Sequence, residues 1–295
     1  MYSSWYRAFG WLARKNLLSW MPDELYLKIA YWGRMKKKLD LKHPQSFNEK
    51  LQWLKINNRK EEYSIMVDKY MVKEYVGHLI GYDYIIPNLG VWDKFEDIDF
   101  DSLPNQFVLK CTHDSGGLVI CKDKSLFDIK MAREKISFCL KQNYYCLNRE
   151  WPYKNVTPRI IAESYLNNNG LEDIPDYKIH CFNGIPRIIL VCKNRFSTNG
   201  LTEDFYSTDW THLDIKRVAH PNAKETISKP EKLEEMIELA KVLSKGIPFV
   251  RIDFYEVSGR VYFGEITFFP ASGMEKFIPE EIDKKLGDLI ELPKL

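Results

Sequence analysis

The chain has 295 residues, of which 45% are hydrophobic and 28% charged, a composition typical of a folded globular protein and not of a disordered one. Its 43 basic and 41 acidic residues give a net charge of +2, which is too small to indicate a nucleic-acid partner. None of the six cysteines has C-x-x-C spacing, which argues against a zinc site. The sequence shows neither the apolar core of a secretory signal sequence nor a long apolar stretch. We therefore expect a cytoplasmic protein whose cysteines are reduced.

The first 20 residues predict an amphipathic helix in which aromatic and apolar side chains alternate with basic ones. The residues concerned are Trp5, Phe9, Leu12 and Trp20, with Arg7, Arg14 and Lys15. Such a helix either packs onto the rest of the protein or contacts the cytoplasmic face of a membrane. The sequence leaves both alternatives open.

The region up to about residue 80 is predicted to be mainly helical. Ser46 and Glu49 have the spacing of a capping box at the start of a helix. A second helix is predicted for residues 68–78, and a short strand for residues 82–87.

From residue 106 onward, runs of β-branched and apolar residues predict strands. Strands are expected at 107–111, 118–122 and 159–165, and a hairpin at 176–182 and 186–192 across Asn183-Gly184. Helices are expected at 128–144 and 230–244.

Two aromatic and apolar runs, 249–255 and 261–267, alternate with period two and predict a hairpin of half-buried strands. Arg251, Asp253 and Glu265 interrupt these runs with charge. A carboxylate in a half-buried strand is costly unless it is paired or binds a ligand. Taken alone, the pattern fits a site for a divalent metal and phosphate as well as it fits a surface hairpin with an Arg–Glu pair.

The loop between these strands decides whether the two carboxylates meet. A two-residue turn, Ser258-Gly259, would put Asp253 and Glu265 on opposite faces of the hairpin. We favour a three-residue loop, 257–259, with Gly259 in the left-handed conformation, because it gathers the polar groups. One face then carries Arg251, Asp253, Glu265 and Thr267, and the other carries Ile252, Phe254, Gly264 and Ile266.

A segment rich in small residues links the strands 107–111 and 118–122. It reads Cys-Thr-His-Asp-Ser-Gly-Gly from residue 111 to 117, with Lys110 before it and Lys122 after it. Small residues allow backbone N–H groups to approach and hold an anion. The segment lacks the G-x-x-x-x-G-K-[ST] pattern of a Walker A loop, and a plain Gly-Gly hairpin remains the alternative.

Further polar residues follow along the chain. Glu163 comes near the end of an apolar strand, and residues 163–166 could present backbone groups to the edge of an adenine ring. Asp176 and Lys178 occupy alternate positions of the next strand and therefore face the same way.

In this order the motifs resemble the ATP-grasp superfamily, and in particular its teichuronopeptide-biosynthesis-type (TupA-like) members. The resemblance spans about residues 46–277 and is most specific at 107–117, 176–184 and 250–273. It implies an α+β fold of the ATP-grasp type, in which two α+β subdomains clasp ATP after a mainly helical N-terminal part. The implied divisions are a helical part at 1–80, a small subdomain with the Gly loop at 81–166 and a C-terminal subdomain with the metal site at 167–295.

The resemblance also implies roles for individual residues. Lys110 and Arg251 are implied in catalysis, Lys110 at the phosphates and Arg251 beside an acyl phosphate. The predicted ATP-binding residues are Lys69, Lys110, Ser115, Gly116, Gly117, Lys122, Glu163, Ser164, Tyr165, Leu166, Asp176 and Lys178. The implied magnesium ligands are Asp253 and Glu265, with Thr267 where many members have asparagine.

The implied activity is that of an ATP-dependent carboxylate–amine ligase, which forms an amide through an acyl phosphate and uses ATP and Mg²⁺. The expected partners are a uronate-containing carbohydrate of a cell-surface polysaccharide and a small amine. A glycosyltransferase of the same pathway is the alternative, although no Asp-x-Asp motif stands at a strand end. A non-catalytic nucleotide-binding protein is a third reading, against which the presence of Lys110, Asp253 and Glu265 together argues.

Overall fold

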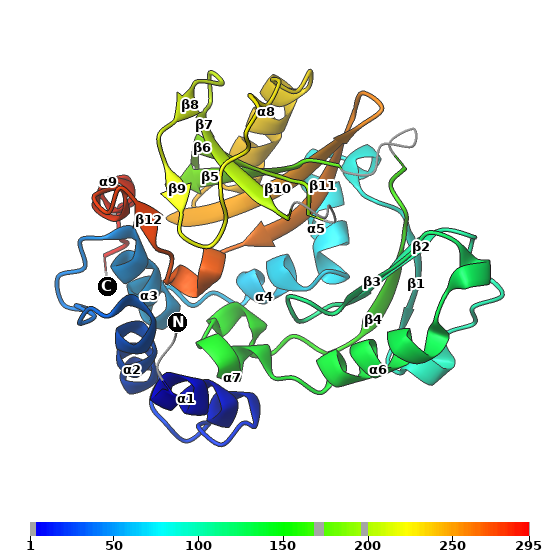
Figure 1. Ribbon diagram of the computed structural model, residues 1–295, viewed down its shortest axis with the longest axis horizontal. Coiled ribbons are helices and arrows are strands. Elements are labelled where there is room, and N and C mark those ends of the chain that lie inside the picture. The colour runs from blue at the N-terminus through cyan, green and yellow to red at the C-terminus, as the bar shows by residue number, and fades with distance from the viewer. Residues whose placement is uncertain (1–3, 168–173, 196–199, 295) are drawn as a thin grey trace.

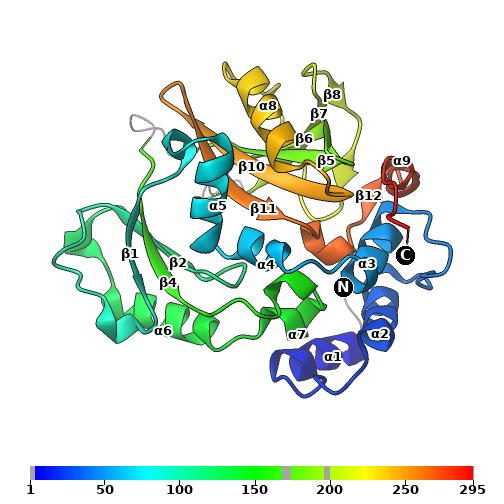
Figure 2. The ribbon, with the colours of Figure 1, turned by 180° about the vertical axis from the view of Figure 1, so that it is seen from behind.

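Two antiparallel β-sheets, one of four strands and one of six, form the frame of the molecule in the computed structural model (Figure 1). The structure describes residues 4–167, 174–195 and 200–294. In the view of Figure 2, the helices within residues 4–57 lie below the six-stranded sheet, and those within residues 62–80 lie in the middle, between the two sheets.

The N-terminal part is helical, as predicted. It contains α1 (Ser4–Arg14), α2 (Asp23–Met35), α3 (Phe47–Asn57), α4 (Glu62–Val67) and α5 (Met71–Ile80). The capping box at the start of α3 is confirmed, because Ser46 Oγ accepts from the Glu49 amide and Glu49 accepts from the Ser46 amide. None of the described helices combines the length and the apolar character needed to cross a bilayer.

The four-stranded sheet follows in sequence. Its strands are β1 (Asn88–Trp92), β2 (Phe107–Cys111), β3 (Leu118–Cys121) and β4 (Ile160–Ser164), in the order β1-β4-β2-β3. The buried residues Phe107, Leu109 and Cys111 alternate along β2 and pack towards α6 (Ile129–Leu140). Val108 and Lys110 therefore face the opposite side, which is the side of the six-stranded sheet.

Two predicted elements of this region differ from the structure. The strand predicted at 82–87 is wrong: residues Tyr82–Tyr84 form the 3₁₀ turn η1, because Tyr82 folds back onto α5 and donates to Glu74 at 2.9 Å. The helix predicted at 128–144 ends at Leu140. A second short helix, α7 (Tyr144–Asn148), begins where Asn143 Oδ1 accepts from the Cys146 amide.

The six-stranded sheet has the order β11-β10-β5-β6-β7-β8. Its strands are β5 (Asp176–Phe182), β6 (Ile185–Lys193), β7 (Thr202–Ser207), β8 (His212–Leu213), β10 (Phe249–Val257) and β11 (Arg260–Thr267). The predicted hairpin across Asn183-Gly184 is confirmed as β5 and β6.

Beside the sheet lie the pair β9 (Lys216–Arg217) and β12 (Phe277–Ile278), the helices α8 (Leu233–Leu243) and α9 (Ile282–Asp288), and the turn η5 (Pro270–Gly273). The remaining 3₁₀ turns are η2 (Phe95–Asp97), η3 (Lys124–Leu126) and η4 (Trp151–Tyr153).

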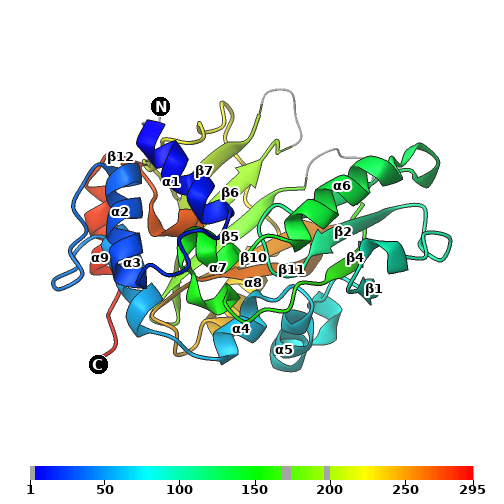
Figure 3. The ribbon, with the colours of Figure 1, turned by 90° about the horizontal axis from the view of Figure 1, so that it is seen from below.

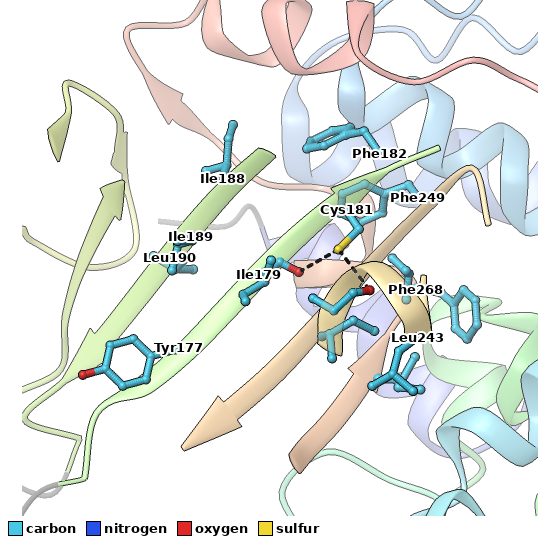
Figure 4. Packing of buried hydrophobic residues seen from close by; sticks show 14 of the residues in the cluster. Tyr177, Ile179, Cys181, Phe182, Ile188, Ile189, Leu190, Leu243, Phe249 and Phe268 are labelled. Carbon is cyan, nitrogen blue, oxygen red and sulfur yellow. Dashed lines mark hydrogen bonds between the residues drawn. The ribbon is translucent and has the colours of Figure 1, made fainter. Parts of the chain in front are cut away.

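The main core lies between the six-stranded sheet and α8. Ile179 and Cys181 of β5 are fully buried, and Cys181 Sγ lies 3.9 Å from the Ala240 carbonyl of α8 (Figure 4). Burial of each such side chain contributes about 1.5–3 kcal/mol to folding, which fixes the strand's register. With these odd-numbered residues on the α8 side, Asp176 and Lys178 face the four-stranded sheet.

The β10–β11 hairpin reaches the predicted arrangement by a different route. Val257 pairs with Arg260, so the turn is the two-residue Ser258-Gly259 and the predicted three-residue loop is wrong. Both turn residues have positive φ, 51° and 73°, which matches the twist of a tight hairpin.

Parity is restored by a β-bulge at Gly264. Phe254 pairs with Phe263 and Asp253 pairs with Glu265, so Gly264 is the extra residue of β11 and has no partner in the ladder. The predicted polar face, Arg251, Asp253, Glu265 and Thr267, is therefore confirmed. A side chain at Gly264 would lie only 3.1 Å from the Asp253 carbonyl oxygen, which explains a glycine at this position.

Candidate active site

A cavity of about 400 Å³ lies between the two sheets. The residues that line it include all the predicted ATP-binding residues and both carboxylates predicted to bind metal. These are Lys69, Lys110, Ser115, Gly116, Gly117, Lys122, Glu163, Ser164, Tyr165, Leu166, Asp176, Lys178, Asp253 and Glu265. The structure thus brings these residues together, while their roles remain predictions.

The Gly loop closes one end of the cavity. Both ends of the loop are anchored, because the Thr112 amide donates to the Arg159 carbonyl at 2.9 Å and the Gly117 amide donates to the Asp114 carboxylate at 3.1 Å. Ser115 and Gly116 at the tip are exposed, and Gly116 has a φ of 128° that a side chain would strain. Lys69 donates to the Asp114 carbonyl, which places its ammonium group at the base of the loop.

A carboxylate with two lysines stands on the wall formed by the four-stranded sheet. Glu163 is 5% exposed and forms ion pairs with Lys110 and, at 2.7 Å, with Lys73. Burial disfavours the charged form of Glu163, but the two ammonium groups outweigh it and hold its pKa at about 2. The two lysines thus line the cavity in positions that Glu163 fixes.

Lys73 is a cavity residue that the sequence analysis missed. It extends from α5 and also donates to the Ile86 carbonyl at 2.6 Å. No local motif marks it, because its place depends on how α5 packs against β4. Arg195, which pairs with Asp176 at the other side of the cavity, was missed for the same reason.

The cavity also has an apolar part, formed by side chains from both sheets and from α5. These are Val72, Ile86, Val108, Ile120, Leu166 and Phe263. Such a lining beside backbone groups of residues 163–166 suits a flat heteroaromatic ring.

The opposite wall carries an ion network centred on Arg251. Its Nε and one terminal nitrogen donate to the two Asp253 oxygens at 2.6 and 2.7 Å, and that terminal nitrogen also donates to Glu265 at 2.8 Å. Lys178 forms a second ion pair with Asp253, which is 1% exposed. Because Asp253 is buried, both cations are needed to compensate its charge.

Glu265 differs from Asp253 in its exposure. Its side chain is 45% exposed towards the cavity, so it can reach a ligand. Burial raises its pKa, but Arg251, Lys178 and Lys69 outweigh burial and hold the pKa at about 2. Glu265 is therefore fully ionised at neutral pH.

The donor set fits magnesium. Two carboxylates on adjacent strands face the cavity, and Mg²⁺ prefers oxygen ligands of this kind, with phosphate and water completing its shell. Among the described residues, no three His, Cys, Asp or Glu side chains gather into a metal-ligand cluster, so the two carboxylates would have to share the ion with phosphates. Thr267 and Arg251 are not part of the cavity lining. The Thr267 hydroxyl instead donates to Glu265 at 3.1 Å, from beside the wall.

Comparison with known proteins gives one match by sequence and several by shape. A protein-family model described as TupA-like ATPgrasp matches residues 49–291. No curated protein matches the chain.

Three solved structures illustrate the matches by shape. The D-alanine–D-alanine ligase of Bacillus anthracis, complexed with ATP, has 18% identity and a TM-score of 0.46, over 77% of this chain and 65% of that one. The D-alanine–D-alanine ligase of Helicobacter pylori has 15% identity and a TM-score of 0.42, over 84% and 70%. The ATP-grasp ligase PsnB, complexed with a minimal precursor, Mg and ADP, has 10% identity and a TM-score of 0.39, over 75% and 57%.

The family match decides the classification. It covers most of the chain, from the first turns of α3 to beyond α9, and includes the Gly loop and the β10–β11 hairpin. The α+β ATP-grasp fold predicted from the sequence is confirmed with it. The chain belongs to the TupA-like ATP-grasp family.

Proposed function

We propose that the protein is an ATP-dependent carboxylate–amine ligase, which forms an amide through an acyl phosphate. One observation carries the proposal: cations and carboxylates from two different sheets face each other across a single cavity. Lys110 with Glu163 stands on one wall, and Lys178 with Asp253 stands on the other. A polyanionic nucleotide between two such walls would find positive charge on both sides.

The proposed reaction has two steps. An oxygen of the acceptor carboxylate attacks the γ-phosphorus of ATP, the bond to ADP breaks, and an acyl phosphate forms. The amine nitrogen then attacks the acyl carbon, phosphate leaves with the C–O electron pair, and the nitrogen loses a proton to give the amide. Lys69 and Lys110, which both line the cavity, would neutralise the charge that develops on the phosphates.

The carboxylates of the opposite wall suit a second role. Asp253 and Glu265 would hold magnesium, which would supply further neutralisation of phosphate charge. Arg251 holds both carboxylates in place through its planar fork of donors. It thereby keeps their oxygens oriented before any ligand arrives.

For the substrates, we propose a uronic acid of a cell-surface polysaccharide as the carboxylate and an amino acid or another small amine as the nucleophile. The support is the family, whose teichuronopeptide-biosynthesis-type members motivate the choice of a uronate. A uronate supplies the carboxylate that the proposed first step consumes.

The proposal is tested by incubating the protein with ATP, magnesium, a uronate-containing oligosaccharide and a panel of amines. We expect ADP and phosphate to appear only when both acceptor and amine are present, with a product heavier by the mass of the amine minus water. The same oligosaccharide with its carboxylates esterified is the substrate control. Glu265→Gln is the protein control, because the side chain is exposed enough for the variant to fold and should leave no turnover.

Two outcomes would contradict the proposal. Release of AMP and pyrophosphate would indicate an adenylating ligase. Transfer of a sugar from a nucleotide sugar without ATP would indicate the glycosyltransferase instead.

A further inference from the structure

Four large apolar side chains are exposed on the first helix and in the turns that follow it, and Trp5, at 36%, is the least exposed of them. Trp11 and Leu17 are each 53% exposed, and Trp20 is 73% exposed. Helix α1 lies at the periphery of the molecule, at the bottom of Figure 1 and again near the viewer in Figure 3. We call Trp11, Leu17 and Trp20, together with the exposed cations Arg7, Arg14 and Lys15, the N-terminal aromatic surface.

The charge of this surface is of one sign. Arg7, Trp11 and Arg14 have the spacing of residues that share one face of a helix, so the tryptophan lies between two guanidinium groups. The first acidic residue of the chain is Asp23. Because the whole chain has 43 basic and 41 acidic residues, the three cations before residue 23 account for all of its net positive charge.

The other face of α1 packs onto the protein. Phe9 contacts the buried cluster around Tyr26, with ring centroids 4.9 Å apart, and Ala13 is 3% exposed. The turn after α1 is held from below, because Arg149 donates to the Leu18 carbonyl at 2.5 Å and to the Met21 carbonyl at 3.4 Å. The segment that carries the exposed tryptophans is therefore held against the rest of the protein by packing and hydrogen bonds.

We propose that the N-terminal aromatic surface docks on an anionic lipid bilayer. Tryptophan favours the headgroup level of a bilayer, where its ring is partly buried and its N–H stays wet. Each exposed arginine or lysine adds attraction to anionic lipids. The proposal rests on the composition and placement of this surface and is independent of the proposed catalytic activity.

The test is co-sedimentation of the full chain with vesicles of two compositions, pure phosphatidylcholine and phosphatidylcholine enriched in phosphatidylglycerol. We expect binding to the phosphatidylglycerol vesicles only, and weaker binding as salt is raised. Arg7→Ala/Arg14→Ala should lower the affinity about 30-fold, the effect of about 1 kcal/mol for each cation at a membrane surface. Trp11→Ala/Trp20→Ala should lower it at least as much.

Phe138→Ala is the matched control, because it removes an exposed aromatic ring, 62% exposed, from α6. This variant should bind vesicles like the wild type, and circular dichroism should show all variants folded. Equal binding to both vesicle types, no binding at low salt, or wild-type binding by the tryptophan variant would each overturn the proposal. A concentration-dependent dimer in sedimentation velocity that the tryptophan variant abolishes would assign the surface to a second copy of the chain and equally overturn it.

Discussion

Asp253 lies directly opposite Glu265 across the β10–β11 ladder, although the turn that joins the two strands has only two residues. The pairing depends on the bulge at Gly264, which adds one residue to β11 between the turn and the carboxylate. Without that extra residue, Glu265 would point to the α8 side of the sheet. The geometry of the proposed metal site therefore depends on a residue that contributes no side chain to it.

Gly264→Val should disturb this arrangement. A side chain here would contact the Asp253 carbonyl oxygen and the Tyr255 ring, both at 3.1 Å, so we expect a loss of about 1–3 kcal/mol in unfolding free energy and a marked fall in turnover. Urea denaturation and ADP release measure the two effects. Gly259→Asn is the control in the same hairpin, because asparagine tolerates the left-handed conformation of the turn. Wild-type turnover in Gly264→Val would show that the bulge is not needed.

Lys110→Ala should weaken ATP binding by about 1.5–3 kcal/mol, the range for a hydrogen bond to a charged group. The lysine is paired with Glu163 before ATP arrives, and phosphate would have to replace that carboxylate, so we expect a value near the lower end. Calorimetric titration with ATP and magnesium provides the measurement. The exposed Lys130→Ala on α6 serves as control, and an unchanged affinity in Lys110→Ala would remove this lysine from the nucleotide site.

Arg251→Lys should lower kcat more than it weakens ATP binding. The guanidinium contacts both oxygens of Asp253 and also Glu265, a geometry that a single ammonium group cannot reproduce. If these contacts matter most as charge develops, kcat should fall roughly 100-fold while the ATP affinity changes little. Steady-state kinetics beside ATP calorimetry distinguishes the two. Arg260→Lys, an exposed arginine of β11, should behave as wild type, and equal losses in kcat and affinity would contradict the assignment.

Glu163 should make stability depend on acid pH. Its pKa is lowered in the folded protein from an ordinary value of 4.5 to about 2, so its stabilising contribution is complete above pH 4.5 and is lost as pH falls towards 2. At neutral pH this contribution amounts to at most ~3 kcal/mol. The difference in unfolding free energy between wild type and Glu163→Gln should therefore shrink steadily below pH 4.5. A difference that stays constant across this range, or one equal to that of the exposed Glu134→Gln, would argue against the ion pairs.

The sequence correctly predicted which residues form the polar face of the hairpin, but it did not correctly predict the length of the turn. Alternation along β10 and β11 predicts which residues are buried, because each apolar position follows the pleat. The buried positions of β11 change phase at Gly264, however, since Val261 and Phe263 are odd-numbered and Ile266 is even-numbered, and this break is the signal that could have placed the extra residue in the strand and not in the turn.

The cavity residues that the sequence analysis did not predict are those whose positions depend on tertiary contacts. Lys73 of α5 forms an ion pair with Glu163 of β4, and nothing in the sequence around Lys73 indicates this contact. The strand predicted at 82–87 failed for a similar reason, since Tyr82 packs back onto α5. By contrast, Asn143 carries a local signal, that of a residue typical of helix starts, which could have revealed the break before α7.

Arg149 has a consequence for how the chain can be shortened. Its guanidinium is 1% exposed, lies 4.3 Å from the centre of the Tyr26 ring, and depends on the Leu18 and Met21 carbonyls for its hydrogen bonds. Deleting the first 22 residues would leave Asp23 as an ion-pair partner of Arg149 but would remove both carbonyl acceptors, and each lost hydrogen bond to a charged group typically costs about 1.5–3 kcal/mol. A truncated protein that loses activity would therefore report on folding and would say nothing about whether the missing segment handles substrate.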